Sequence, residues 1–188
     1  MSDERLTWSQ TLSRLRADRR RLRALLAEQG GRRPVRLGLH PSFVCVLLYR
    51  ISNHFSRAGH RYVARFFWHL NALLTGADIS PPSDLGEGLV IVSPPGVTIS
   101  TKAGRNLTVM PLAGIGSELG RRRDIGAGPG LPVLGDDVQL GPLCGVLGPV
   151  RVGHRVRVGA GAVVLKDVPD DTLVEGPQAR FLRRADPP

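Results

Sequence analysis

The sequence is poor in cysteine, lysine and aromatic residues, and it has no long apolar run. Cys45 and Cys144 have no second cysteine or nearby histidine to complete a metal cluster, so we expect buried free thiols in a reducing compartment. The longest apolar run, from Phe43 to Tyr49, is too short to span a bilayer. The first residues have neither the basic end nor the apolar stretch of a secretory signal. These absences predict a cytoplasmic protein with no membrane span and no metal.

The positive charge is confined to one part of the chain. The 188 residues carry a formal net charge of +10, and residues 1–76 hold fourteen arginines, no lysine and four acidic residues, which accounts for the whole excess. Residues 77–188 are formally neutral and contain most of the glycine and proline. A hydrophobic content of 41% is enough for a core and excludes a disordered chain. The composition therefore predicts two different regions joined near Gly76.

The second region repeats with a period of six residues. A leading apolar residue recurs in two series, which are Ile79, Leu85, Ile91, Val97, Ala103, Val109 and Ile115, and then Leu134, Leu140, Val146, Val152, Val158 and Val164. Glycine directly follows several of these leading residues. The two series are 19 residues apart, which is not a multiple of six, so a segment of about residues 120–132 is expected to leave the repeat as a loop.

A period of six fits neither an α-helix nor a single strand. It fits short strands that meet at tight corners, with the leading residue pointing inward and three strands forming one triangular coil. A turn-rich β-sandwich is the alternative, but its strands usually recur every 8–12 residues. We therefore predict a mainly β fold, in which a parallel β-helix of hexapeptide repeats covers residues 77–170. An α-helical region precedes it over residues 1–76, and a C-terminal tail follows over residues 171–188.

Residues 4–29, 42–57 and 61–74 have the apolar spacing of helices. The arginines of the first helix allow three interpretations: binding of nucleic acid or an anionic membrane surface, pairing with acids of another subunit or partner, or a solvated face. Since lysine is absent from this region, the arginine content reflects a compositional bias, so a structural or oligomeric role is favoured over nucleic-acid binding. The four histidines of this region are expected to be structural.

Four segments of the sequence carry a resemblance to a known family. They are Thr75-Gly-Ala-Asp-Ile79, Leu85-Gly-Glu-Gly-Leu89, the stretch from Val158 to Pro169, and Gly176-Pro-Gln-Ala-Arg180. Over about residues 45–182 the chain resembles the bacterial serine O-acetyltransferases, which are hexapeptide-repeat acyltransferases. This resemblance implies a left-handed β-helix, acetyl-CoA or another acyl-CoA as co-substrate, a trimer or a multiple of three, and a place in cysteine biosynthesis. It also implies that the N-terminal helices contact another subunit or a protein partner.

The resemblance also shows which catalytic residues the sequence lacks. In the family a histidine takes the proton of the acceptor hydroxyl as that hydroxyl attacks the thioester. The family's aspartate–histidine pair falls at Val92 and Ser93, its second histidine at Leu131, and a third histidine at Ser80. Loss of a general base costs about 10²–10⁴-fold in rate. A serine hydroxyl cannot replace it, because it hardly accepts a proton near neutral pH.

His154 is the one histidine inside the repeat. Counting coils by eighteen residues places it on a different face from Ser93, so it is a weak candidate for the missing base. An exposed histidine at a corner of the coil is the simpler interpretation.

Two corners of the repeat are expected to bind coenzyme A through backbone N–H groups, as the resemblance implies. They comprise Gly141, Pro142, Gly159, Ala160 and Gly161. Pro142 has no N–H, so one donor is lost there. Arg121, Arg122 and Arg123 in the predicted loop are candidates for the phosphates of coenzyme A, and a solvated surface loop explains them equally well. Arg180, which matches the end of the family motif, is a further candidate for cofactor binding, and a tether of the C-terminal tail is the other interpretation.

The sequence therefore predicts acyl-CoA-dependent O-acyl transfer to a small hydroxylated acceptor, either serine or another substrate. The alternative is a catalytically silent homologue that acts as a scaffold or regulatory subunit, since the family's histidine positions are empty.

Overall fold

The computed structural model describes residues 6–28, 37–118 and 120–178. Its helices are α1 (Trp8–Glu28), the short 3₁₀ helix η1 (Leu37–Leu39), α2 (Pro41–Arg57) and α3 (Arg61–Thr75). Proline is favoured at the start of α2 because an N–H in the first turn would have no partner within the helix. Gly76 ends α3 in the left-handed conformation, with φ of 72°, and donates its N–H to Ala72. The predicted α-helical N-terminal region is confirmed.

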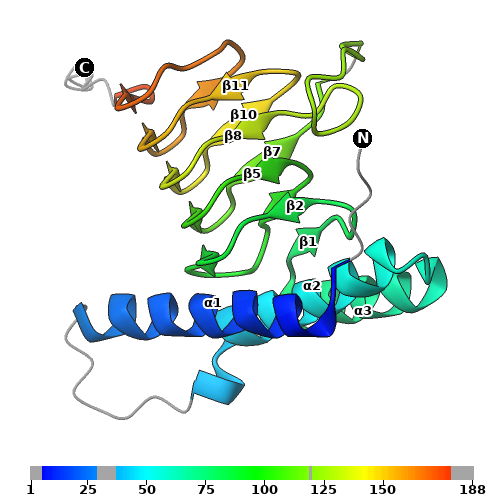
Figure 1. The fold of residues 1–188 in the computed structure, drawn as a ribbon. Coiled ribbons are helices and arrows are strands. Elements are labelled where there is room, and N and C mark those ends of the chain that lie inside the picture. Colours follow the sequence, from blue (N-terminus) through cyan, green and yellow to red (C-terminus); the bar gives the residue numbers. More distant parts are fainter. Residues whose placement is uncertain (1–5, 29–36, 119, 179–188) are drawn as a thin grey trace, which may run out of the picture.

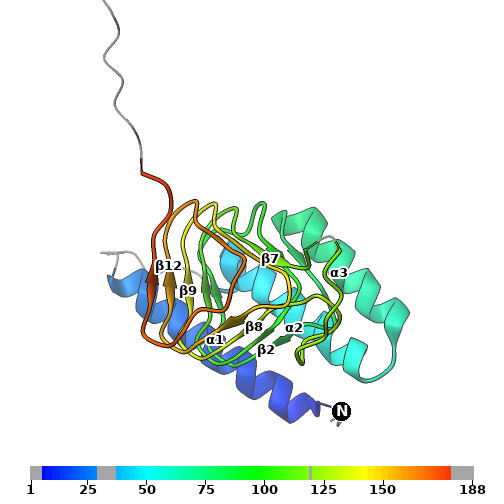
Figure 2. The same ribbon diagram turned by 90° about the horizontal axis from the view of Figure 1, so that it is seen from above.

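Short parallel strands form the rest of the described chain. They are β1 (Asp78–Ile79), β2 (Asp84–Leu85), β3 (Val90–Ile91), β4 (Thr98–Ile99), β5 (Lys102–Ala103), β6 (Thr108–Val109), β7 (Gly114–Gly116), β8 (Val133–Leu134), β9 (Gln139–Leu140), β10 (Gly145–Leu147), β11 (Arg151–Val152), β12 (Arg157–Val158), β13 (Val163–Val164) and β14 (Leu173–Val174). They form three parallel sheets. The first has the order β1-β4-β7-β10-β13, the second β11-β8-β5-β2 and the third β14-β12-β9-β6-β3. The predicted left-handed parallel β-helix is confirmed, and its coils stack above the helices (Figures 1 and 2).

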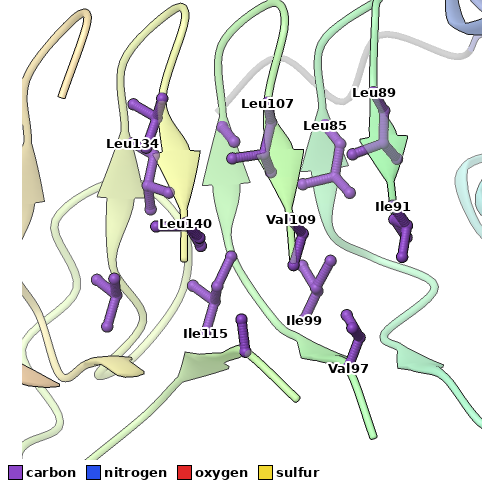
Figure 3. Close-up of a cluster of buried hydrophobic side chains, with 14 of the residues drawn as sticks. Leu85, Leu89, Ile91, Val97, Ile99, Leu107, Val109, Ile115, Leu134 and Leu140 are labelled. Atoms are coloured by element: carbon purple, nitrogen blue, oxygen red, sulfur yellow. The ribbon is translucent and has the colours of Figure 1, made fainter. Parts of the chain in front are cut away.

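The leading residues of the hexapeptides fill the interior of the β-helix. Every residue of both predicted series is buried, from Ile79 at the first coil to Val164 at the last. Large aliphatic side chains such as Leu85, Ile99 and Leu140 stack in columns along the axis (Figure 3). Burial of such a continuous apolar column is the main force that holds successive coils together.

The register of the first sheet differs from the predicted period of six. Ile79 pairs with Ile99, twenty residues later, and Ile99 pairs with Ile115, sixteen residues later. Val97, which the period placed in a strand, instead lies before β4, and its carbonyl oxygen accepts the N–H of Asp78 in β1. The turn that contains Pro94 and Pro95 is two residues longer than the period allows, and the next turn is two residues shorter. Because Val97 is also fully buried, burial alone does not reveal this shift.

Two predicted boundaries are corrected by the structure. The loop that leaves the repeat begins at residue 117 rather than at about 120, because β7 ends at Gly116 and β8 begins at Val133. The predicted tail begins too early, because β14 pairs with β12 and extends the β-helix to Val174.

Glycines at one corner allow the coils to stack at close distance. A Cβ atom on Gly135 would lie 2.8 Å from the carbonyl carbon of Gly153 and 2.9 Å from the nitrogen of His154. Gly86, Gly104 and Gly153 stack in the same column, and a Cβ on any of them would also meet backbone atoms of the next coil below 3.0 Å. The glycine that follows a leading residue is therefore required by the backbone of the neighbouring coil.

The helices close the open end of the first coil through a buried ion pair. Arg50 Nε donates to Asp18 at 2.9 Å, and both side chains are almost fully buried. Arg50 also donates to the carbonyl oxygens of Leu85 and Gly86, and Asp18 accepts the N–H of Leu89. Burial opposes the charge of Arg50, but attraction to the Asp18 carboxylate leaves the pKa of Arg50 above its ordinary value. These contacts fix α1 and α2 to the β-helix.

We predict that Gly135→Ala destabilises the fold and that Gly38→Ala does not. The added methyl group at residue 135 meets backbone atoms of the next coil, which should lower the free energy of unfolding by about 1–3 kcal/mol. A Cβ on Gly38 meets no atom within 4 Å, so this variant is the control. Urea denaturation followed by circular dichroism measures both. Equal stability of the two variants would contradict the close stacking of the coils.

We also predict that Asp18→Ala is far more damaging than Arg14→Gln. Removal of Asp18 leaves the guanidinium of Arg50 buried without its counter-ion, which should cost about 3–5 kcal/mol. The Arg14–Asp84 pair (3.3 Å) joins the same helix to the same coil but is partly exposed, so its loss should cost about 0–1 kcal/mol. Urea midpoints of the two variants test the difference, and similar small losses would show that the buried pair is not needed.

Candidate functional site

Each candidate residue lies on one of the three edges of the β-helix, where the chain passes from one sheet to the next. Edge 1 joins the first sheet to the second, edge 2 joins the second to the third, and edge 3 joins the third sheet back to the first. Edge 1 comprises residues 80–83, 100–101, 117–132, 148–150 and 165–167. Edge 2 comprises residues 86–89, 104–107, 135–138, 153–156 and 169–172. Edge 3 comprises residues 92–97, 110–113, 141–144 and 159–162.

Ser93 lies on edge 3 at the first coil, half-buried beside α2. Ser42, the second residue of α2, donates its hydroxyl to the carbonyl oxygen of Val92 at 3.0 Å. The side chain of Val92 packs against the apolar cluster that includes Leu22 of α1 and Val90. Val92, where the resemblance predicts the family's aspartate, is thus a packing residue. No pattern in the sequence indicates the Ser42 contact.

Leu131 lies on edge 1, in the segment of residues 117–132. A short hydrogen-bonded turn holds it in place, because Leu131 donates its N–H to Gly128, and Gly126 and Gly128 both donate to the carboxylate of Asp124. Arg121 forms an ion pair with Glu118 at 3.2 Å. Arg122 and Arg123 are exposed. Leu131 and these arginines therefore share one edge, while Ser93 lies on another.

His154 lies on edge 2, in a ladder of hydrogen bonds between coils. Its Nδ1 accepts the backbone N–H of Asp136 at 3.0 Å. The backbone N–H of His154 donates to the carboxylate of Asp170 at 2.8 Å. The carboxylate of Asp136 accepts the N–H of Arg105 in the same way, one coil earlier. A Nδ1 that accepts this hydrogen bond is the unprotonated nitrogen of the ring, which leaves Nε2 as the N–H donor. His154 thus acts as a link between coils.

A shallow groove of about 650 Å³ follows the second sheet beside edge 2, and the sequence did not predict it. The glycines 104, 135 and 153 contribute to its lining. Its remaining lining includes His154 and charged residues of both signs, namely Lys102, Asp136, Arg151, Asp167 and Asp170. The glycine that directly follows a leading residue was the only sequence signal for this groove.

The predicted coenzyme A corners both lie on edge 3. Their N–H groups are mostly occupied, because Gly141 donates to Val158, Gly159 to Val174 and Gly161 to Pro142. Ala160 is exposed, and its N–H has no acceptor among the described residues. The structure therefore leaves Ala160 as the available donor of this set. Arg180 lies outside the described residues.

The chain is similar to known proteins with hexapeptide repeats. The family model for the bacterial transferase hexapeptide (six repeats) matches residues 132–166. A serine acetyltransferase of Helicobacter pylori is 32% identical over 151 residues, which are 78% of this chain and 84% of that protein. The chain belongs to the serine acetyltransferase family.

Other serine acetyltransferases extend the match. That of Synechococcus elongatus is 33% identical over 78% of this chain, and the chain spans only 59% of that relative's length. The crystal structure of the Neisseria gonorrhoeae serine acetyltransferase in complex with serine has a TM-score of 0.76 and 25% sequence identity. That match covers 92% of this chain and 69% of the other. The fold of this serine acetyltransferase family member therefore extends through the helices as well as the repeat.

Within one chain of this family member, the three candidate base positions do not meet. Ser93 lies on edge 3, Leu131 on edge 1 and His154 on edge 2. Edges 1 and 3 both border the first sheet, whereas edge 2 lies on the far side of the prism. The structure thus agrees with the prediction that His154 and Ser93 occupy different faces.

The cysteine thiols of this family member are poorly suited to nucleophilic catalysis. Burial raises the pKa of Cys45 and of Cys144 to about 11, so each is a neutral thiol near pH 7. Among the described residues, no group of three or more histidine, cysteine, aspartate or glutamate side chains is arranged to hold a metal ion.

We predict that His154→Asn keeps the stability of the protein and that His154→Ala lowers it. The asparagine oxygen can accept the N–H of Asp136, whereas alanine removes the acceptor at a cost of about 0.5–1.5 kcal/mol. Thermal denaturation of the two variants measures this difference. Acyl transfer should be unchanged in His154→Asn, and a loss of activity in that stable variant would identify His154 as a base instead.

Proposed function

We propose that this chain is an acyl-CoA-dependent O-acyltransferase that uses acetyl-CoA and a small hydroxylated acceptor, in the cytoplasm. The observation that carries this proposal is its membership of the serine acetyltransferase family, with a fold that matches a serine-bound relative over 92% of the chain. The acceptor is serine or another small alcohol. The identity of the acceptor depends on how its hydroxyl proton is removed.

In this proposal, no histidine at position 93 or 131 removes the proton of the acceptor hydroxyl. Attack of a neutral hydroxyl on a thioester requires removal of its proton in the transition state. Ser93 and Leu131 cannot accept that proton near neutral pH, and Val92 is packed against Leu22 and Val90. Transfer to serine is therefore slow unless another subunit, the acceptor itself or water serves as the base. An acceptor that carries its own basic group meets this requirement.

We propose that the donor lies along edge 3, as in the family. Ala160 supplies a free N–H for an amide of the pantetheine arm, and Pro142 supplies none. Arg122 is exposed and available for the phosphates of coenzyme A, whereas Arg121 is already paired with Glu118. Arg180 is a further candidate for the same phosphates.

Assembly into a trimer would complete this site. Ser93 and Leu131 lie on the two edges that border the first sheet, so a neighbouring copy is needed to bring edge 1 beside edge 3. The outward residues of the first sheet above β1 include Thr98, Leu147 and Val163, and none of its strand residues there is charged. A face without charge suits burial between subunits.

The alternative is a catalytically silent family member that binds coenzyme A or a partner subunit. The observation that favours it is the absence of an acid–base side chain at both Ser93 and Leu131. The two proposals differ in whether thiol is released from acetyl-CoA.

We predict that the purified protein releases thiol from acetyl-CoA slowly with serine and that the variant Val92→Asp/Ser93→His/Leu131→His is faster. Since a general base contributes about 10²–10⁴-fold, the triple variant should gain at least about tenfold. The control is Arg157→His, which adds an exposed histidine on the outer face of the third sheet instead of at position 93 or 131.

A thiol reagent follows the release of coenzyme A, and a thermal-shift assay reports its binding. Turnover with another hydroxylated acceptor but not with serine would assign a changed substrate. Binding of coenzyme A without turnover on any acceptor would support the silent alternative. The absence of both turnover and thermal shift would rule out the acyltransferase proposal.

A further inference from the structure

The helical layer has a face that points away from the β-helix, which we call the underside. In α2, Ser42, Tyr49 and Asn53 donate hydrogen bonds into the first coil. An α-helix turns by about 100° per residue, so the opposite face of α2 is formed by four other residues. These are Val44, Leu47, Ile51 and Phe55, which are all apolar and only partly buried. The underside of α2 is therefore an apolar stripe.

α3 extends this apolar surface. Its exposed side chains include Phe66 at 62%, Leu73 at 82% and Leu74 at 62% relative exposure, and Tyr62 and Val63 are also exposed. α3 is fixed to α2 by its opposite face, where Ser52 donates to the carbonyl oxygen of Ala64 and Asn71 donates to that of Cys45. Large apolar side chains on a free helix face indicate a surface that is covered in function.

A row of aromatic rings joins the three helices. The ring centroids of Trp8 on α1 and Phe55 on α2 are 5.7 Å apart, and those of Phe55 and Phe67 on α3 are 6.0 Å apart. Phe66 lies next to Phe67 at 5.4 Å. Since α2 lies between α1 and α3 (Figure 2), the aromatic row crosses the whole layer. The apolar surface is thus shared by all three helices.

α1 borders this surface with a row of arginines. Arg16, Arg19, Arg20 and Arg23 are exposed, and with Ser13 they line a hollow of about 450 Å³. Arg16, Arg20 and Arg23 lie on the side of α1 opposite Asp18, which is bonded to the first coil, and Arg19 lies at the border of that side. Like charges three and four residues apart destabilise a helix. An anionic ligand at this hollow would offset the repulsion among the four arginines.

Acidic residues are almost absent from the described helices. α2 and α3 contain none, and α1 contains only the buried Asp18 and the terminal Glu28. The underside thus combines apolar and aromatic side chains with uncompensated positive charge. Such a surface is complementary to an anionic partner and repels an identical surface of a second copy.

We propose that the underside docks on the surface of an anionic lipid bilayer. The apolar residues of α2 and α3 enter the boundary between headgroups and acyl chains, and the arginines of α1 bind the lipid phosphates. None of the described helices is sufficiently long and apolar for a transmembrane span, so the contact is interfacial. This inference is independent of the proposed acyl transfer, and it chooses one of the interpretations that the sequence left open for the arginine-rich helix.

Sedimentation with lipid vesicles tests the proposal on the full chain. We expect binding to phosphatidylcholine vesicles that contain about one-third phosphatidylglycerol, and little binding to pure phosphatidylcholine. Because each arginine near the surface contributes about fivefold to partitioning, Arg16→Gln/Arg19→Gln/Arg23→Gln should weaken binding about 100-fold. Phe66→Ser/Leu74→Ser should also weaken it, and roughly 0.5 M NaCl should remove most of the electrostatic part.

Two control variants remove arginines and leucines from the β-helix instead of from the underside. Arg122→Gln/Arg151→Gln/Arg157→Gln removes three exposed arginines of the β-helix, and Leu143→Ser/Leu173→Ser removes two exposed leucines there. Both should bind vesicles as the unmodified protein does. The proposal is overturned by equal binding to neutral and anionic vesicles, by no binding to either, or by equal losses in the control variants. It is also overturned if light scattering shows an oligomer that Phe66→Ser/Leu74→Ser dissociates, because a second copy would then cover the underside.

Discussion

The buried pair of Arg50 and Asp18 is the contact on which the arrangement of the two regions depends. A β-helix leaves the backbone groups of its first coil without partners, and these must be satisfied wherever water is excluded. Arg50 and Asp18 bond to three such groups, at Leu85, Gly86 and Leu89, and they neutralise each other in the process. The same two side chains join α1 to α2. One ion pair thus fixes the helical layer, closes the coil and determines which helix faces remain free.

The repeat was predictable because it depends on a simple rule. An inward aliphatic residue at every sixth position is enough to specify coils of short strands, and every such residue is buried in the structure. The register shift at Ile99 was not predictable in this way. Val97 and Ile99 are both apolar and both buried, so the pattern is satisfied by either alignment. Only the pairing of Ile79 with Ile99 shows that the turn with Pro94 and Pro95 is longer.

The candidate site was predictable in its residues but not in its geometry. The family resemblance identified Ser93 and Leu131, and His154 was a candidate as the one histidine inside the repeat. Coil counting separated Ser93 from His154. It did not show that Ser93 and Leu131 border the same sheet from opposite edges, because the loop of residues 117–132 interrupts the count. It also did not show that His154 bonds to the coils on both sides of it. Hydrogen bonds between residues sixteen to thirty-one positions apart leave no local pattern in a sequence.

The separation of charge between the two regions affects how the molecule is oriented as it approaches a charged surface. Residues 1–76 carry the whole excess of +10, and the neutral coils rise from one side of the helical layer (Figure 1). A body that is charged at one end experiences a torque in an electric field, so a negative surface would turn it before contact. The helices would then arrive first, with the axis of the β-helix standing upright. Edges 1 and 3, and the site proposed between them, would then point away from that surface.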